Sequence, residues 1–286
     1  MGIDMKVLIS TDMEGISGVV DFSQTRVGGG EYERARRYFT HDVNAAVQGC
    51  VDGGASEIVV TDSHAFQLNV LYEDLHPEAE LVIGAKTSHR ANLVLETLDN
   101  SFDLIFLLGI HAGAHLGGVI AHTYLLPATF WEVRINGTAV GETEIATALA
   151  GASGVPLGLL TGDDVTVGAA IKLFPEIETV ITKRAIGRTA ARCLSLSKTG
   201  HLIEAASKRA VERRKQGEFT PWTFKPPLTL EIICGHSGVA DKLAFCPGAT
   251  RIGERQVALE TDSYQALYHG LITFCYLGTL AMDPPP

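Results

Sequence analysis

Short apolar runs that alternate with helical periodicity are the feature that most constrains how this chain can fold. The run that follows Asp103 and ends at Leu108 is apolar throughout, as expected of a strand whose two faces are both covered. Further strands are predicted at 6–9, 57–61, 81–83, 157–160 and 180–183, with an edge strand at 133–135, and helices at 31–50, 92–98, 142–150 and 165–173. This alternation predicts an α/β fold, with a mainly parallel sheet flanked by helices.

The pattern changes after about residue 184. A long charged helix is predicted near 199–216, followed by a proline-bearing link, strands near 228–233 and 256–260, and an apolar helix over 264–282. We interpret this part as a smaller C-terminal α+β domain, so that the predicted domains are 1–184 and 185–286. The apolar last helix fits either a core position or a surface that associates with other subunits.

Composition excludes several classes of partner. The formal net charge of -10 argues against binding to nucleic acid, which needs clusters of Lys and Arg. The one basic run, 208–215, lies in a predicted helix with Glu204 and Glu212 and is interpreted as a solvated face. Neither a signal peptide nor a membrane-spanning apolar run is found, so no membrane partner is expected. Five scattered cysteines without a C-x-x-C pair are typical of reduced thiols in a cytoplasmic protein.

The segment Ser10–Gly15 carries the strongest chemical signal. Asp12 and Glu14 are two residues apart where the first predicted strand leaves the sheet, so their side chains should point to the same side. Carboxylates that face each other repel unless a cation or a proton lies between them. Gly15 lets the backbone turn directly afterwards. The segment therefore predicts a metal site.

Other predicted strands end in residues of the same kind. Asp62 and His64 follow the second strand, His111 follows the strand that ends at Leu108, and Glu142 opens a helix. Ligands of open α/β sheets bind outside the carboxyl ends of the strands, so these side chains should meet at one rim. Imidazole and carboxylate together suit zinc, with manganese and cobalt as rivals.

Several neighbouring residues allow two interpretations. His122 lies in an apolar stretch and could be a hydrogen-bonded core histidine, and His115 is interpreted as a loop histidine rather than a ligand. The pair Asp163-Asp164 could support the site, although a helix N-cap is the favoured interpretation. The glycines at 28–30 fit a mobile active-site loop and a plain turn equally well.

These residues also carry a resemblance. The Ser-x-Asp-x-Glu-Gly pattern at Ser10–Gly15 resembles the signature of the zinc-dependent D-aminopeptidase family. Further matches follow in order along essentially the whole chain: Asp62-Ser63-His64, Leu108-Gly109-Ile110-His111-Ala112, Val119 to His122, Asn136-Gly137, Val140-Gly141-Glu142, Gly162-Asp163-Asp164 and Pro247-Gly248.

The resemblance implies a metal-dependent aminopeptidase that removes the N-terminal residue of short peptides or amino-acid amides, with a preference for D-residues. It implies two zinc ions per subunit and a ring-shaped decamer. In that scheme Asp12 matches the bridging ligand, Glu14, His64, His111 and Glu142 match the other ligands, and His122 matches the catalytic histidine. Two other functions remain possible: a different metal-dependent amidohydrolase on the same scaffold, and a non-catalytic peptide-binding protein.

Overall fold

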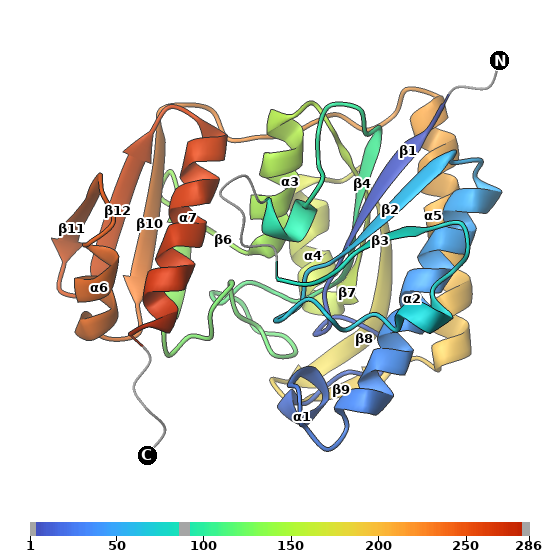
Figure 1. Cartoon of the computed structure of the whole chain (residues 1–286), viewed down its shortest axis with the longest axis horizontal. Helices are drawn as coiled ribbons and strands as arrows, with labels where there is room; N and C mark the ends of the chain where they lie inside the picture. Colours follow the sequence, from blue (N-terminus) through green and yellow to red (C-terminus); the bar gives the residue numbers. More distant parts are fainter. Residues whose placement is uncertain (1–3, 86–91, 282–286) are drawn as a thin grey trace. The chain divides into compact units, whose positions relative to one another are not determined.

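The computed structural model describes residues 4–85 and 92–281, which form two compact units (Figure 1). Unit 1 consists of Met1–His111, Gly118–Ile120 and Ser153–Pro221. Unit 2 consists of Ala112–Gly117, Ala121–Ala152 and Trp222–Pro286. No helix in the described part of the chain has the length and apolar character needed to span a membrane.

Unit 1 is built on a seven-stranded sheet of order β3-β2-β1-β4-β7-β8-β9. The strands are β1 (Lys6–Thr11), β2 (Glu57–Asp62), β3 (Glu80–Val82), β4 (Leu104–Ile110), β7 (Leu157–Asp163), β8 (Glu178–Gly187) and β9 (Ala190–Cys193). All neighbouring strands are parallel except β8 and β9. The predicted α/β fold with a mainly parallel sheet is therefore confirmed.

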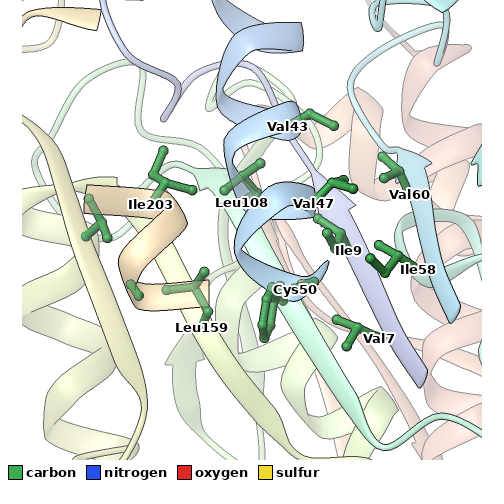
Figure 2. Packing of buried hydrophobic residues seen from close by; sticks show 14 of the residues in the cluster. Val7, Ile9, Val43, Val47, Cys50, Ile58, Val60, Leu108, Leu159 and Ile203 are labelled. Atoms are coloured by element: carbon green, nitrogen blue, oxygen red, sulfur yellow. The ribbon is translucent and has the colours of Figure 1, made fainter. Parts of the chain in front are cut away.

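The helices α2 (Tyr32–Asp52) and α5 (Leu196–Lys215) pack against each other and cover one face of this sheet. Figure 2 shows the resulting core, in which Ile9 of β1 lies beside Val47 of α2, and Val7 and Val43 belong to the same cluster. Each fully buried aliphatic side chain of this kind stabilises the fold by roughly 1.5–3 kcal/mol. The remaining helical elements of unit 1 are α1 (Phe22–Thr25), α4 (Asp164–Leu173), which packs on β7 and β8, and the single 3₁₀ turns η1 (Tyr72–Asp74) and η2 (Leu93–Leu95).

The basic run on α5 is a solvated face, as predicted. Arg209 and Arg213 both pair with Glu178, at 2.8 and 2.7 Å, and Arg213 also pairs with Glu218. These cations are already neutralised by carboxylates of the same unit, which agrees with the interpretation of the run as an ordinary helix surface.

In its described residues, unit 2 is an antiparallel sheet of order β11-β12-β10-β5-β6 with three helices. Its elements are β5 (Phe130–Ile135), β6 (Thr138–Val140), α3 (Glu142–Ala152), β10 (Leu228–Cys234), α6 (Ser237–Leu243), β11 (Ala249–Gly253), β12 (Gln256–Thr261) and α7 (Tyr264–Thr279). Helix α7 packs on β10, β12 and α3, and its Leu271 and Phe274 are fully buried. The structure thus supports the core interpretation of this apolar helix.

Two predicted elements differ from the structure. The segment 92–98 forms only the short turn η2 and not an α-helix, because Leu93 and Thr97 have φ of 45° and 71°, which a right-handed α-helix cannot contain. The strand at 133–135 is not an edge strand: β5 pairs with β10 on one side and β6 on the other. It ends at a tight turn, where Asn136 and Gly137 both have positive φ.

The smaller α+β unit was predicted to begin near residue 185. The compact units of the structure run differently, since β8, β9 and α5 belong to the sheet of unit 1, whereas β5, β6 and α3 belong to unit 2. The domain boundaries 1–184 and 185–286 stay a prediction.

The strand order of unit 1 indicates where a ligand would bind at the sheet. From β1 the chain proceeds to β2 and β3 on one side, and then returns to add β4, β7 and β8 on the other side. The order therefore reverses between the adjacent strands β1 and β4. In open α/β sheets ligands bind beyond the carboxyl ends of the strands at such a reversal. Asp12 and His111 directly follow these two strands.

Candidate functional site

The two carboxylates of the first motif share one imidazole. Nδ1 of His64 lies 3.1 Å from Oδ1 of Asp12 and 3.0 Å from Oε2 of Glu14. The prediction that Asp12 and Glu14 point to the same side is confirmed, although the reason differs. Strand β1 ends at Thr11, so both residues lie in the turn that follows the strand.

This turn is fixed against the end of β4. The amide of Asp12 donates to the carbonyl of Leu108 at 2.8 Å, and the amide of Gly15 donates to the carbonyl of Gly109 at 2.7 Å. A Cβ atom at Gly15 would lie 2.2 Å from the carbonyl oxygen of Ile110, so only glycine allows this approach. His111 follows directly, and its Nε2 lies 3.4 Å from Oδ2 of Asp12.

The imidazole of His64 is oriented by a backbone carbonyl. Its Nε2 lies 2.7 Å from the carbonyl oxygen of Thr25, at the end of α1. Since a carbonyl only accepts, Nε2 must carry the proton in this arrangement. Nδ1 is then the nitrogen directed at Asp12 and Glu14. A second contact of this kind is what orients metal-binding histidines in proteins.

Asp62 supports the loop that carries His64. Its Oδ2 accepts from the backbone amides of Asn69 and Val70, and its Oδ1 accepts from the side chain of Asn69 at 2.9 Å and from the amide of His64 at 3.3 Å. Asn69 also donates to the carbonyl of His64 at 2.7 Å. Both carboxylate oxygens of Asp62 thus accept hydrogen bonds from the loop, and Asp62 is a supporting residue rather than a ligand.

The donors of unit 1 are buried and charged. Asp12, Glu14, His64 and His111 are 6%, 4%, 8% and 2% exposed. Burial and the adjacent Glu14 raise the pKa of Asp12 above its usual value. Burial alone would lower the pKa of His64, but the carboxylates of Glu14 and Asp12 outweigh it and raise that pKa well above the ordinary range. The buried carboxylates are therefore stabilised by a proton or by a positive charge beside them.

A metal ion fits this requirement. One ligand atom from each of Asp12, Glu14 and His64 lies within 4.8 Å of the others, and all three residues are buried. Two carboxylates and an imidazole with an oriented second nitrogen are donors that zinc accepts. The residues present therefore suit the ion that the sequence predicted.

In unit 2 the structure brings His122 and Glu142 together. One potential ligand atom of each lies within 4.8 Å of the other. Glu142 is the first residue of α3, and its Oε1 accepts from the backbone amide of Tyr124 at 2.7 Å. Tyr124 has φ of 59°, a conformation that non-glycine residues rarely adopt. His122 is half-buried, so it is not the fully enclosed core histidine of the structural interpretation.

His115 and Asp163 are placed as predicted, whereas the sequence allows two equal interpretations of the glycines at 28–30. His115 is exposed and lies in a loop. Asp163 is the N-cap of α4, where its Oδ1 accepts from the amide of Thr166 at 2.8 Å, and its Oδ2 also accepts from the amide of Val119 at 2.7 Å. The glycines at 28–30 form a turn after α1, in which the amide of Gly29 donates to the carbonyl of Arg26.

Sequence reasoning missed the residues that hold the ligand turn from a distance. The carbonyl of Thr25 and the side chains of Thr182 and Lys183 contact this region. Burial lowers the pKa of Lys183 to about 8. One feature of the sequence could have pointed to Lys183. This residue lies in the strand predicted at 180–183, and strands covered on both faces rarely contain lysine.

Comparison with known proteins assigns the chain to a family. Residues 5–273 match the family model described as D-aminopeptidase. The chain belongs to the D-aminopeptidase family. It is similar to a D-aminopeptidase of Bacillus subtilis (strain 168), with 32% identity over 268 residues that cover 92% of this chain and 95% of the relative.

A solved structure extends the similarity to three dimensions. The zinc-dependent D-aminopeptidase DppA from Bacillus subtilis, described as a self-compartmentalizing protease, superposes with a TM-score of 0.91 at 30% identity. The match covers 96% of this chain and 98% of that chain. The predicted family and the predicted class of activity, a metal-dependent aminopeptidase, are confirmed. The comparisons give no support to the other amidohydrolase or to the non-catalytic binding protein.

The role of Asp62 can be tested with Asp62→Asn. An amide has a single acceptor oxygen, so two of the donors that converge on Asp62 would face an NH₂ group. Loss of such charge-assisted hydrogen bonds should lower the free energy of unfolding by about 1.5–3 kcal/mol, as measured by urea denaturation. Asp74→Asn, at an exposed carboxylate, is the control and should change it by less than about 0.5 kcal/mol. Equal stability of the two variants would contradict the supporting role.

Proposed function

We propose that this chain hydrolyses the N-terminal residue of short peptides or amino-acid amides, prefers D-residues, and uses two zinc ions per subunit. The observation that carries the proposal is the buried cluster of Asp12, Glu14 and His64 beyond the end of β1. The family match and the zinc-dependent structural relative support the choice of reaction and metal.

The proposed ligands are the five residues that match the family pattern. Asp12 is proposed as the bridging ligand, since its two oxygens already approach different histidines, Oδ1 towards His64 and Oδ2 towards His111. Glu14, His64, His111 and Glu142 are proposed as the remaining ligands. Zinc, when bound, supplies Lewis acidity, which lowers the pKa of water towards 7 and polarises a carbonyl group.

The chain itself supplies orientation and proton transfer. The carbonyl of Thr25 and the amide of Tyr124 hold His64 and Glu142 in place, so that little reorganisation is needed during the reaction. His122 is proposed as the residue that moves a proton or donates a hydrogen bond to the developing oxyanion. Both roles need the half-exposed position that His122 occupies.

A cytoplasmic location is proposed on the chemistry of the cysteines. All five cysteines lie in the described residues and all are free. Free thiols persist in a reducing compartment. We expect no nucleic-acid partner, in keeping with the net charge of -10.

The function can be tested by metal removal and return. The chelated protein should not hydrolyse dipeptides or amino-acid amides, and activity should return with zinc. A panel of matched D- and L-substrates, read by amine release, decides the handedness. Equal activity with and without metal, or no turnover of any substrate in the panel, would contradict the proposal.

Assembly is a further expectation. The structural relative is described as self-compartmentalizing, and we propose that this chain forms a closed ring, with a decamer as the expected size. Light scattering at micromolar concentration should give a mass that is a large multiple of the 30.6 kDa subunit. A stable monomer under the same conditions would exclude the ring.

The bridging role of Asp12 predicts unequal effects of two neighbouring substitutions. Asp12→Ala should remove both zinc ions, because a bridging carboxylate serves both, whereas Glu14→Ala should mainly weaken one. Elemental analysis after dialysis measures the zinc retained per subunit. Two equivalents retained in Asp12→Ala would rule out the bridge.

The role of His122 is tested by His122→Gln. A proton-transfer group contributes about 10²–10⁴-fold to the rate, so kcat should fall by about that factor. Zinc content and Tm should stay close to the wild-type values, because His122 is half-exposed and is not counted among the ligands. Loss of zinc would make His122 a ligand, and a lowered Tm with normal kcat would make it a structural residue.

A further inference from the structure

Three successive carbonyl groups of the ligand turn are held by two successive side chains of β8. Nζ of Lys183 donates to the carbonyl of Glu14 at 2.5 Å and to that of Ile16 at 2.8 Å. The hydroxyl of Thr182 lies 2.7 Å from the carbonyl oxygen of Gly15, between them. The same hydroxyl lies 3.1 Å from the carbonyl oxygen of Gly162 in β7. The turn after β1 is therefore attached to a strand that is not its neighbour in the sheet.

A slip in the strand register explains how both side chains reach one turn. Successive side chains of a regular strand point to opposite faces. Here Gly162 of β7 pairs with Ile181, but the next residue, Asp163, pairs with Lys183. One residue of β8, Thr182, is thus left over in the ladder, as in a β-bulge. Bulges re-aim side chains and are frequent beside active sites.

The burial of Lys183 is unusual for a residue with only a structural role. The residue is 1% exposed, and no carboxylate lies within salt-bridge distance of it among residues 4–85 and 92–281. Burying an ammonium group is costly, and lysine is almost never fully buried unless it is paired. A neutral hydroxyl or amide group could hold a turn with a smaller desolvation cost. The side chains that carry such groups are shorter than lysine, however, and do not combine its reach with two donated hydrogen bonds.

We propose that Lys183 is a positioning residue, which together with Thr182 fixes the turn that carries Asp12 and Glu14 in the geometry needed to bind zinc. This inference rests on the proposed function, because it takes Asp12 and Glu14 as metal ligands. The amino group can donate two hydrogen bonds whether or not it is charged. Its effect is on the backbone: hydrogen bonds to the carbonyls of Glu14 and Ile16 restrain the peptide planes of the turn, and with them the position from which the Glu14 side chain reaches His64.

The test compares zinc binding in Lys183→Met with that in a matched variant. Methionine has a similar length and no donor, so the substitution removes the two hydrogen bonds and little volume. The matched variant is Val47→Ala, which creates a cavity in the core between α2 and the sheet. It is the control for a general loss of stability. Zinc dissociation constants are measured by chelator competition, and the visible spectrum of the cobalt-loaded protein reports the ligand geometry.

In Lys183→Met the zinc dissociation constant should rise about 10–100-fold, as when second contacts of metal ligands are removed, and the cobalt spectrum should change. Val47→Ala should lower Tm but keep the wild-type affinity and spectrum. Thr182→Val, which retains the lysine, should raise the zinc dissociation constant by a smaller factor. This second variant tests the inference if Lys183→Met does not fold.

Wild-type affinity and spectrum in Lys183→Met, or in Thr182→Val where the lysine variant does not fold, would overturn the inference and leave the proposed function intact. Equal weakening in the Val47→Ala control would also overturn it, since any loss of stability would then have the same effect. If the wild type binds no zinc, or if Asp12→Ala binds zinc as the wild type does, the proposed metal site itself fails and the inference with it.

Discussion

The contact between two pieces of backbone, the turn after β1 and the end of β4, determines the rest of the site. Gly15 and Gly109 make it possible: a Cβ on Gly15 would lie 2.2 Å from the carbonyl oxygen of Ile110, and one on Gly109 would lie 2.2 Å from that of Asp12. Because both lack a side chain, the two strand ends approach to hydrogen-bond distance. That approach places Asp12 beside His111, at the reversal of strand order where α/β sheets bind ligands.

Burying the carboxylates of Asp12 and Glu14 side by side costs free energy of desolvation and repulsion. Contacts with the surrounding residues offset this cost. Burial and the adjacent Glu14 both disfavour the charged form of Asp12 and raise its pKa. His64 lies between them, and its ring is fixed by the carbonyl of Thr25. Asp62, which resembles a ligand in sequence, instead accepts the amides of the loop that carries His64. His64 is thus held by a backbone carbonyl and by a loop whose amides donate to Asp62.

The local parts of this arrangement were predictable from the sequence. The apolar strands and the residues that follow them lie next to each other in the chain, so the parallel sheet and the convergence of Asp12, His64 and His111 follow from strand ends alone. The helix predicted at 92–98 failed because the left-handed conformations of Leu93 and Thr97 leave no mark in apolar periodicity. The contacts of Thr182 and Lys183 lie 167 and 169 residues from Gly15 and Glu14 and depend on a register slip, which no sequence pattern encodes.

This long-range attachment has a consequence for dynamics. A turn held only by its own strand can open locally, because few contacts are lost when it does. Here β4 and β7 lie between β1 and β8 in the sheet, and the turn is bonded to β4 through Gly109, while Thr182 of β8 reaches both Gly15 and the β7 residue Gly162. Opening the turn would break its hydrogen bonds to two other strands of the sheet, β4 and β8, at the same time. The carboxylates of Asp12 and Glu14 therefore share the stability of the whole sheet, which is what a preformed metal site needs if binding is not to include the cost of ordering a loop.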